Sequence, residues 1–332
     1  MRRLPYILVL AFIILSLVTG CGDSDNTEQK QEGHEGTEPI ELKLGMPKAP
    51  PTLPLLRMME TNALGGNVKL ELAIWESTEN MIAMASDDSY PIMAVPVNVG
   101  AQLYNKGINI KLANVNTWGV IYLVSSDPAV KDWADLRGKA VYIAFKGAPP
   151  DMITKYLLQE KGLTPGEDVE MIYSTPAEVA QLLKGGKIQN AVNIEPFIQA
   201  GRSEGDNIRI IAGYGSEWRK IQGDEFDLPN AGIVFKDKFI NEHRELADKF
   251  QAEYEKALKW TVENPGEAGA LAEKHLGFKK ELIEKAMPNL ALKYKSAIDA
   301  KAELEKYYNV LSGFEVQCIG GKLPDEAFYY GK

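Results

Sequence analysis

From Ile40 to about Lys238, short hydrophobic runs rich in β-branched residues alternate with segments whose apolar residues recur at helical spacing. This alternation is typical of α/β layers with largely parallel sheets. It predicts strands over residues 42–45, 68–74, 92–95, 108–113, 120–124, 140–144, 169–172, 191–193, 208–212 and 231–235. Helices fill most of the gaps, so the sequence predicts an α/β fold.

Helix boundaries can also be predicted. Thr52 is expected to cap one helix, which Gly65 and Gly66 end, and Ser77 is expected to cap the next. Beyond Lys238 strands nearly vanish, and the spacing predicts helices over residues 239–262, 267–275, 281–287 and 296–311. The last third of the chain is therefore expected to be a helical block.

The chain begins with Met-Arg-Arg, followed by an almost unbroken hydrophobic run over residues 4–18, which is typical of a secretory signal. The run ends in Leu-Val-Thr-Gly-Cys, which resembles the lipobox of bacterial lipoproteins, where the signal is cut before the cysteine. The resemblance implies lipidation of Cys21 and an extracytoplasmic protein anchored to the cell membrane. The alternative is a spanning helix, which needs about 20 residues.

Residues 22–39 are polar and acidic and contain no large apolar side chain, so they cannot bury enough surface to fold. We interpret this segment as a flexible tether with a span of roughly 25 Å.

Composition excludes several kinds of partner and chemistry. The 46 acidic residues outnumber the 37 basic ones, and no basic block occurs, which argues against nucleic acid as a partner. Two cysteines and three histidines are too few for a disulfide framework, a cysteine-rich zinc site or an iron–sulfur cluster. G-x-S-x-G, phosphate-loop and H-E-x-x-H motifs are missing from the sequence. We therefore expect a protein that is not an enzyme and has no cofactor or metal.

Polar and aromatic residues follow the predicted strands, at the strand ends where ligands bind in open α/β sheets. Two aromatic faces with neutral hydrogen-bonding groups suit a small ligand that is flat or partly apolar. Trp75 and Trp118 are the strongest candidates, although a core or capping role stays open for each residue. The candidate ligand-binding residues are Trp75, Glu76, Ser77, Asn98, Asn116, Trp118, Lys146, Gly147, Asn193, Glu195 and Tyr214.

The loop after Lys146 bears on the charge of the ligand. A nitrate or sulfonate needs hydrogen-bond donors, which the helix predicted to begin near Pro149 would supply. Pro149 and Pro150, however, have no N–H, and no arginine lies in a predicted pocket loop. The loop chemistry favours a heteroaromatic or otherwise uncharged organic ligand over nitrate, and a sulfonate-like ligand stays open.

Several segments occur in a characteristic order: Asp-Leu-Arg-Gly-Lys-Ala-Val at 135–141, Gly-Leu at 162–163, Pro-Ala-Glu at 176–178, residues 183–191, and Asn-Ile-Glu-Pro at 193–196. Over residues 40–310 this order resembles the solute-binding proteins of nitrate, sulfonate/taurine and thiamine-pyrimidine ABC importers. Asn190 replaces the family's usual aspartate, and the loop after Asp88 has changed. We therefore expect a ligand different from those of the named members.

The resemblance implies the periplasmic binding protein type II fold, in which two α/β lobes are joined by two crossing strands, here residues 116–126 and 228–236. Lobe one would comprise residues 40–120 plus 232–332, including the helical block, and lobe two residues 121–231. Residues 1–20 would be the signal peptide and 21–39 the tether. The lobes would clamp a small solute and present the closed form to a membrane permease, with the protein as a monomer.

The function expected from this resemblance is that of a substrate-binding lipoprotein of an ABC importer. One alternative is a sensing lipoprotein that presents its closed form to a receptor. Another is an enzyme of the same fold, like the pyrimidine-forming relatives of thiamine synthesis, which depend on histidine and cysteine-rich segments that this chain lacks.

Overall fold

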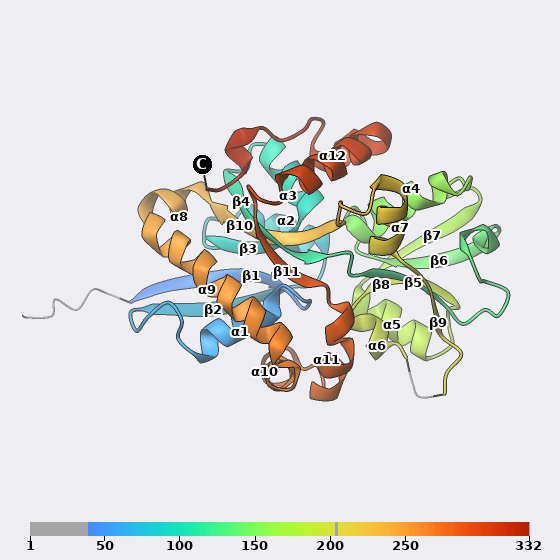
Figure 1. Cartoon of the computed structure of the whole chain (residues 1–332), viewed down its shortest axis with the longest axis horizontal. Coiled ribbons are helices and arrows are strands. Elements are labelled where there is room, and N and C mark those ends of the chain that lie inside the picture. The colour runs from blue at the N-terminus through green and yellow to red at the C-terminus, as the bar shows by residue number, and fades with distance from the viewer. Residues whose placement is uncertain (1–38, 203–204, 332) are drawn as a thin grey trace, which may run out of the picture. The chain divides into compact units, whose positions relative to one another are not determined.

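The computed structural model describes residues 39–202 and 205–331 (Figure 1). The predicted signal peptide, Cys21 and the tether up to residue 38 lie outside these residues. Within the described part of the chain, no helix combines the length and the apolar character needed to cross a membrane.

The first sheet has six strands in the order β11-β4-β10-β3-β1-β2. The pairs β1/β2 and β1/β3 are parallel, whereas β10 runs antiparallel to both β3 and β4, and β11 antiparallel to β4. We call this sheet and its helices lobe one. Its strands are β1 (Ile40–Pro47), β2 (Val68–Trp75), β3 (Ile92–Pro96), β4 (Ile110–Trp118), β10 (Pro229–Lys236) and β11 (Leu292–Ser296). Its helices are α1 (Thr52–Glu60), α2 (Thr78–Ala85), α3 (Val97–Asn105), α8 (Asp237–Glu242), α9 (Arg244–Glu263), α10 (Pro265–Leu276), α11 (Lys280–Ala286) and α12 (Lys301–Glu315).

The second sheet has five strands in the order β7-β6-β8-β5-β9, and we call it and its helices lobe two. β6 pairs in parallel with β7 and β8, and β5 pairs antiparallel with β8 and β9. The strands are β5 (Ile121–Ser125), β6 (Lys139–Ala144), β7 (Val169–Ser174), β8 (Asn190–Ile194) and β9 (Arg209–Gly213). The helices are α4 (Pro149–Glu160), α5 (Pro176–Lys184), α6 (Phe197–Ala200) and α7 (Tyr214–Gln222).

Two adjacent crossings join the lobes. The chain passes from β4 through Gly119 and Val120 into β5, and it returns through Leu228 into β10. The Gly119 N–H donates to the Leu228 carbonyl at 2.9 Å, so the crossings lie side by side. Gly119 has φ +54°, and a Cβ there would come within 2.9 Å of the Gly215 Cα, which leaves room for glycine alone. The predicted two-lobed α/β architecture with two crossing strands is confirmed.

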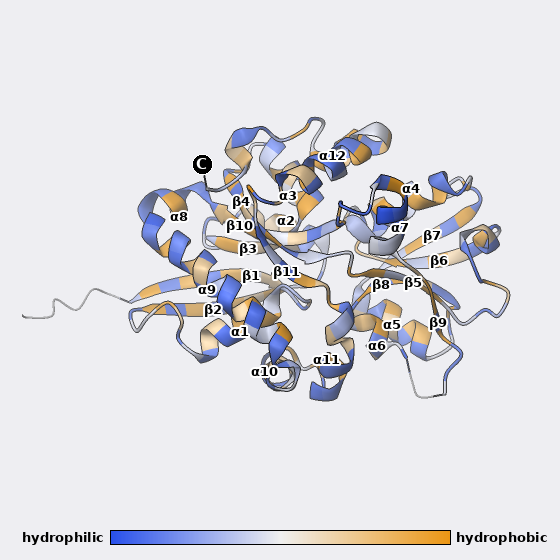
Figure 2. Ribbon diagram, in the orientation of Figure 1, coloured by the Kyte–Doolittle hydropathy of each residue, from blue (hydrophilic) through white to orange (hydrophobic). Residues whose placement is uncertain are grey.

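Helix α9 shows how the helices cover the first sheet. Its buried residues recur every three or four positions and form one apolar stripe, while much of its opposite face is hydrophilic (Figure 2). Phe250 of this stripe contacts Phe235 of β10, with ring centroids 5.7 Å apart. The strands between the helices are mostly hydrophobic in Figure 2, as expected for sheets covered on both faces.

The structure corrects the predicted sheet type. Both sheets are mixed rather than largely parallel, because the crossing strands β4, β5 and β10 enter their sheets antiparallel to the neighbouring strands. Strand β11 was not predicted, because its Leu-Lys-Tyr-Lys-Ser sequence carries two lysines and lies among helical patterns. Helix α12 consequently begins at Lys301 and not at residue 296.

Other predicted helix boundaries were wrong as well, and one is confirmed. Helix α1 ends at Glu60 and not at Gly65 and Gly66. Thr52 is the first residue of α1 and not its cap, because Pro51 occupies the cap position and the Thr52 hydroxyl donates to the Pro47 carbonyl. The predicted helix 239–262 is divided into α8 and α9 at His243. Ser77 caps α2 as predicted, since its hydroxyl accepts the Asn80 N–H at 3.1 Å.

A candidate solute site between the lobes

A small apolar cavity, which we call the chamber, lies where the carboxyl ends of β1, β2, β3, β6 and β8 meet. Its free volume is about 30 Å³, and residues of both lobes line it. Six of these residues are prolines, namely Pro47, Pro50, Pro51, Pro96, Pro149 and Pro150. Trp75, Thr117, Phe145, Ile194 and Asn230 also line the chamber.

Contacts between the lobes close the chamber on one side. The rings of Trp75 in lobe one and Phe145 in lobe two meet edge to face, with centroids 5.9 Å apart and planes at 65°. The Asn98 amide donates to the Gly147 carbonyl at 2.9 Å, and the Thr78 hydroxyl donates to the Lys146 carbonyl at 3.2 Å. The structure thus brings predicted residues from both lobes into one region.

The orientation of Trp75 is fixed by its own hydrogen bond. Its indole N–H donates to the Ala94 carbonyl of β3 at 3.1 Å, and only 3% of the residue is exposed. The N–H is therefore used within lobe one, and the indole offers the chamber an aromatic surface rather than a hydrogen-bond donor.

A second cavity of about 370 Å³, which we call the mouth, adjoins the chamber at Phe145, which lines both cavities. Its charged lining residues are Glu76 and Glu79 from lobe one, and Lys146 and Glu178 from lobe two. The Lys146 ammonium lies 5.3 Å from the ring centroid of Tyr173. With three carboxylates against one ammonium, the mouth is an acidic region.

The amino end of α4 reaches the chamber through Ala148, Pro149 and Pro150. The two prolines have no N–H to offer a ligand. Asp151, which is 1% exposed, comes next, and its carboxylate accepts the Gly147 N–H at 2.8 Å and the Tyr173 hydroxyl at 2.9 Å. The positive end of this helix dipole is therefore balanced by a carboxylate of the protein itself.

Asn230 of β10 is a chamber residue that the sequence analysis missed. It is 8% exposed, and its side-chain oxygen is buried with no hydrogen-bond partner among residues 39–202 and 205–331. A buried carbonyl oxygen without a donor is costly, so it is a natural position for a donor on a ligand. The sequence did contain a signal for this contact, because Asn230 is a polar residue in the segment predicted to return to lobe one beside the cleft.

The structure places Trp118 in a different cavity. Successive side chains of a strand point to opposite faces, so Thr117 faces the chamber while Trp118 faces a cavity of about 350 Å³ behind the crossing strands. Its indole N–H donates to the Lys293 carbonyl at 2.7 Å, and the Lys295 ammonium lies 5.3 Å from its ring centroid. Trp118 and Trp75 therefore do not share a pocket, contrary to the expectation that both would face one ligand.

Three other predicted residues are buried, and their polar side-chain groups form hydrogen bonds within the protein. The Asn116 amide donates to the Asn114 side chain at 3.0 Å, and the Asn193 amide donates to the Pro176 carbonyl at 2.9 Å. The Tyr214 hydroxyl lies 2.6 Å from the Thr154 hydroxyl in the core of lobe two. Because these groups are satisfied within the protein, we do not retain Asn116, Asn193 and Tyr214 as ligand contacts.

Glu195 follows β8 at the junction of the two lobes. Its side chain is fully buried, and its backbone N–H donates to the carbonyl of Val120, in the first crossing, at 3.3 Å. One carboxyl oxygen accepts the Gln199 N–H at 3.2 Å, while the other is without a hydrogen-bond partner in the described part of the chain. Burial raises the pKa of Glu195 to about 7, although hydrogen bonding with Gln199 lowers it in part.

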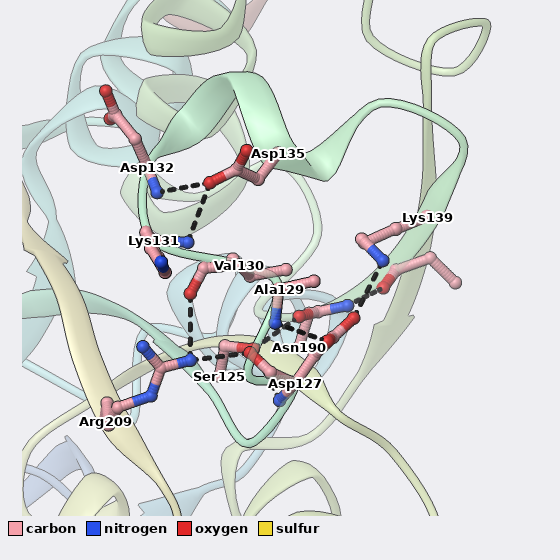
Figure 3. A network of polar contacts seen from close by, with 11 residues as sticks. Ser125, Asp127, Ala129, Val130, Lys131, Asp132, Asp135, Lys139, Asn190 and Arg209 are labelled. Atoms are coloured by element: carbon pink, nitrogen blue, oxygen red, sulfur yellow. Dashed lines mark hydrogen bonds and ion pairs between the residues drawn. The ribbon is translucent and has the colours of Figure 1, made fainter.

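The Asp-Leu-Arg-Gly-Lys segment, which contributed to the family resemblance, belongs to a network of polar contacts in lobe two (Figure 3), and none of its residues lines the chamber. The Asp135 carboxylate accepts the N–H groups of Lys131 and Asp132 at 2.8 and 3.0 Å. The Lys139 ammonium lies 2.7 Å from the Asp127 carboxylate. The segment is therefore a structural motif.

Asn190 belongs to the same network and not to the chamber. Its side-chain oxygen accepts the Ser125 hydroxyl at 2.7 Å, and its amide donates to the Ala140 carbonyl at 3.2 Å (Figure 3). Asn190 begins β8, whereas Ile194 at the other end of the strand lines the chamber. The replacement of the family's aspartate at this position is therefore a change in packing and says little about the ligand.

Comparisons with known proteins agree with this architecture. Residues 59–274 match the model of the NMT1-like family. The protein YtlA of Bacillus subtilis (strain 168) is 27% identical over 150 residues, which cover 45% of this chain and 42% of YtlA. The chain thus aligns with less than half the length of this relative.

Solved structures are similar over most of the chain, and two of them serve as examples. An ABC transporter protein from Parabacteroides distasonis has a TM-score of 0.74 and 24% identity, covering 88% of this chain and 99% of its own. The periplasmic aliphatic sulphonate binding protein SsuA from Escherichia coli has a TM-score of 0.68 and 16% identity, covering 89% and 95%. At these identities the likeness concerns the fold.

Proposed function

The chain belongs to the NMT1-like family, and from this premise we propose that it is the solute-binding component of an ABC importer. The observation that carries the proposal is the chamber, whose walls come from both lobes and which lies beside the two crossings. A ligand that contacts both walls favours the closed arrangement over an open one. Hinge motion about the crossings then converts binding into a shape that a membrane permease recognises.

We propose an organic solute with an aromatic or apolar body. Because the free volume of the chamber is about 30 Å³ here, the two lobes must stand further apart when such a body is bound between them. Trp75, Phe145 and the six prolines offer mostly apolar surface, and Asn230 and Asn98 supply polar groups at the lobe junction. Glu76, Ser77, Lys146 and Gly147 complete the proposed site at its outer end. The sequence also left a sulfonate-like solute open. The matched ammonium, alcohol and sulfonate ligands described below distinguish these solute classes.

We further propose that Cys21 carries a lipid and that residues 22–39 tether the lobes to the outer surface of the cell membrane as a monomer. Mass spectrometry of the membrane-extracted protein should show a lipidated cysteine at its amino terminus. Replacing Cys21 by serine should release the protein from the membrane fraction. An unmodified amino terminus that starts at Met1 would contradict the proposal.

The function itself is tested by identifying small molecules that copurify with the protein. The identified solute, added at 100 times its dissociation constant, should raise the free energy of unfolding by about 2.7 kcal/mol and make the solution shape more compact. If neither a copurified molecule nor any member of a broad solute library has these effects, the proposal fails. Deletion of the gene should also abolish uptake of the solute, whereas normal uptake with lost signalling would favour a sensor.

Trp75→Ala provides a test of the site, with Trp118→Ala as the matched tryptophan control. Trp75 lines the chamber and Trp118 lines the cavity behind the crossings. We expect Trp75→Ala to weaken solute binding more than tenfold with the fold intact by circular dichroism. A larger loss from Trp118→Ala than from Trp75→Ala would place the solute behind the crossings.

A further inference from the structure

We infer that the solute carries a positively charged nitrogen, and that the chamber and mouth select organic cations over anions of the same shape. The inference rests on the proposed function and specifies its solute class. Three features of the site support it. They are the excess of carboxylates in the mouth, the unpaired Asn230 oxygen beside aromatic rings in the chamber, and the lack of free N–H groups at the amino end of α4.

The charges of the mouth favour a cation. Glu76 and Glu79 stand on the lobe-one side of this cavity, and Glu178 stands opposite on lobe two. Glu178 accepts a hydrogen bond from the Ser174 hydroxyl, and none of the three carboxylates forms an ion pair within the described residues. Lys146 is the one cation among the residues that line the mouth. A charged nitrogen that entered here would meet more negative than positive groups.

The chamber offers acceptors and aromatic surface. The side-chain oxygen of Asn230 is buried without a donor, and an ammonium group has N–H donors and no acceptor. Trp75, which lines the chamber, and Phe145, which lines both cavities, add the electron-rich ring surfaces that attract cations. The unpaired oxygen and the rings therefore favour a cation, as the carboxylates of the mouth do.

The N–H groups that normally bind an anion at a helix amino terminus are either missing from the chamber wall or already bonded within the protein. A helix amino terminus binds anions through free N–H groups and its positive dipole end. Here α4 presents Pro149 and Pro150, which lack N–H groups, and its dipole is balanced by the buried Asp151 carboxylate. The Gly147 N–H, which precedes the helix, is bound to Asp151 as well. The Asp151 carboxylate also pairs with the Lys155 ammonium at 3.5 Å. A sulfonate at this wall would therefore meet proline rings and N–H groups that are already bound within the protein.

Matched ligands test the inference on the full chain. We would use benzyl, naphthylmethyl and cyclohexylmethyl bodies, each as the ammonium, the alcohol and the sulfonate, and measure binding by calorimetry. We expect at least one ammonium compound to bind, at least tenfold more tightly than its sulfonate. A sulfonate that binds as tightly as its ammonium, a panel with no ammonium binder, or a copurified solute without a cationic nitrogen would overturn the inference.

Charge variants locate the effect. The double variant Glu76→Gln/Glu79→Gln should weaken ammonium binding about tenfold and change alcohol binding less than twofold, whereas Lys146→Gln should strengthen ammonium binding. Glu71→Gln is the matched control, since Glu71 is an exposed carboxylate on β2 four residues before Trp75. Equal effects of the double variant on ammonium and alcohol would refute a charge effect at the mouth.

The two proposals can fail separately. If a neutral or anionic solute raises the melting temperature and closes the lobes, the proposed function stands and the charge selectivity is refuted. If no solute of any charge does so, the proposed function fails as well.

Discussion

Replacement of Glu195 by glutamine tests whether a buried carboxyl at the lobe junction makes the protein less stable as the pH rises. The Glu195 side chain is fully buried, and one of its oxygens has no hydrogen-bond partner in the described part of the chain. Burial raises its pKa from 4.5 to about 7, because the charged form loses its hydration. Glutamine has the same shape, cannot ionise, and retains an oxygen that can accept the Gln199 N–H.

The sign and size follow from proton linkage. Between pH 4.5 and about 7 the folded protein keeps the Glu195 proton, while the unfolded chain has released it. The free energy of unfolding therefore falls as the pH rises through this window. Since one pKa unit corresponds to about 1.4 kcal/mol, the interval from 4.5 to about 7 amounts to roughly 3 kcal/mol.

The assay is urea unfolding, followed by tryptophan fluorescence at pH values from 4.5 to 8. At pH 8 the Glu195→Gln protein should be more stable than the original by up to roughly 3 kcal/mol, and at pH 4.5 the two should differ by less than about 1 kcal/mol. Glu71→Gln, at an exposed position, should leave the pH profile unchanged. Parallel profiles for the original protein and Glu195→Gln would refute the reasoning.

Two further predictions concern the junction of the lobes. Gly119→Ala should destabilise the protein more than Gly138→Ala, because both glycines have positive φ but only a Cβ at Gly119 meets backbone, at 2.9 Å from the Gly215 Cα. The control should cost about 1 kcal/mol by urea unfolding, and equal losses would contradict a close approach at the crossing. Asn98→Ala removes the bond to the Gly147 carbonyl and should shift the solution scattering of the protein toward a more open shape. Asn105→Ala, whose amide bonds stay within lobe one, should not, and identical scattering from both variants would show that the Asn98 bond does not hold the lobes together.

The sequence by itself determined the features that depend on neighbours along the chain. Hydrophobic periodicity predicted the strands of both sheets except β11, and local capping chemistry predicted that Ser77 caps α2. The order of segments indicated two lobes and two crossings, which the structure contains. These signals act over a few residues, so they can be interpreted without knowing what packs against them.

Only the tertiary structure decided which candidate side chains meet. Trp75 and Trp118 both follow a predicted strand and look equivalent in the sequence. Side chains alternate between the two faces of β4, so Trp118 lies in the cavity behind the crossings, whereas the Trp75 ring contacts Phe145 in the chamber. Asn190, Asn193 and Tyr214 are polar residues near strand ends, but partners distant in the sequence satisfy their side chains. Asn230, by contrast, lines the chamber with no partner for its oxygen among the described residues. The reason is that strand order, register and hydrogen-bond partners depend on contacts between segments far apart in the chain, which local patterns do not encode.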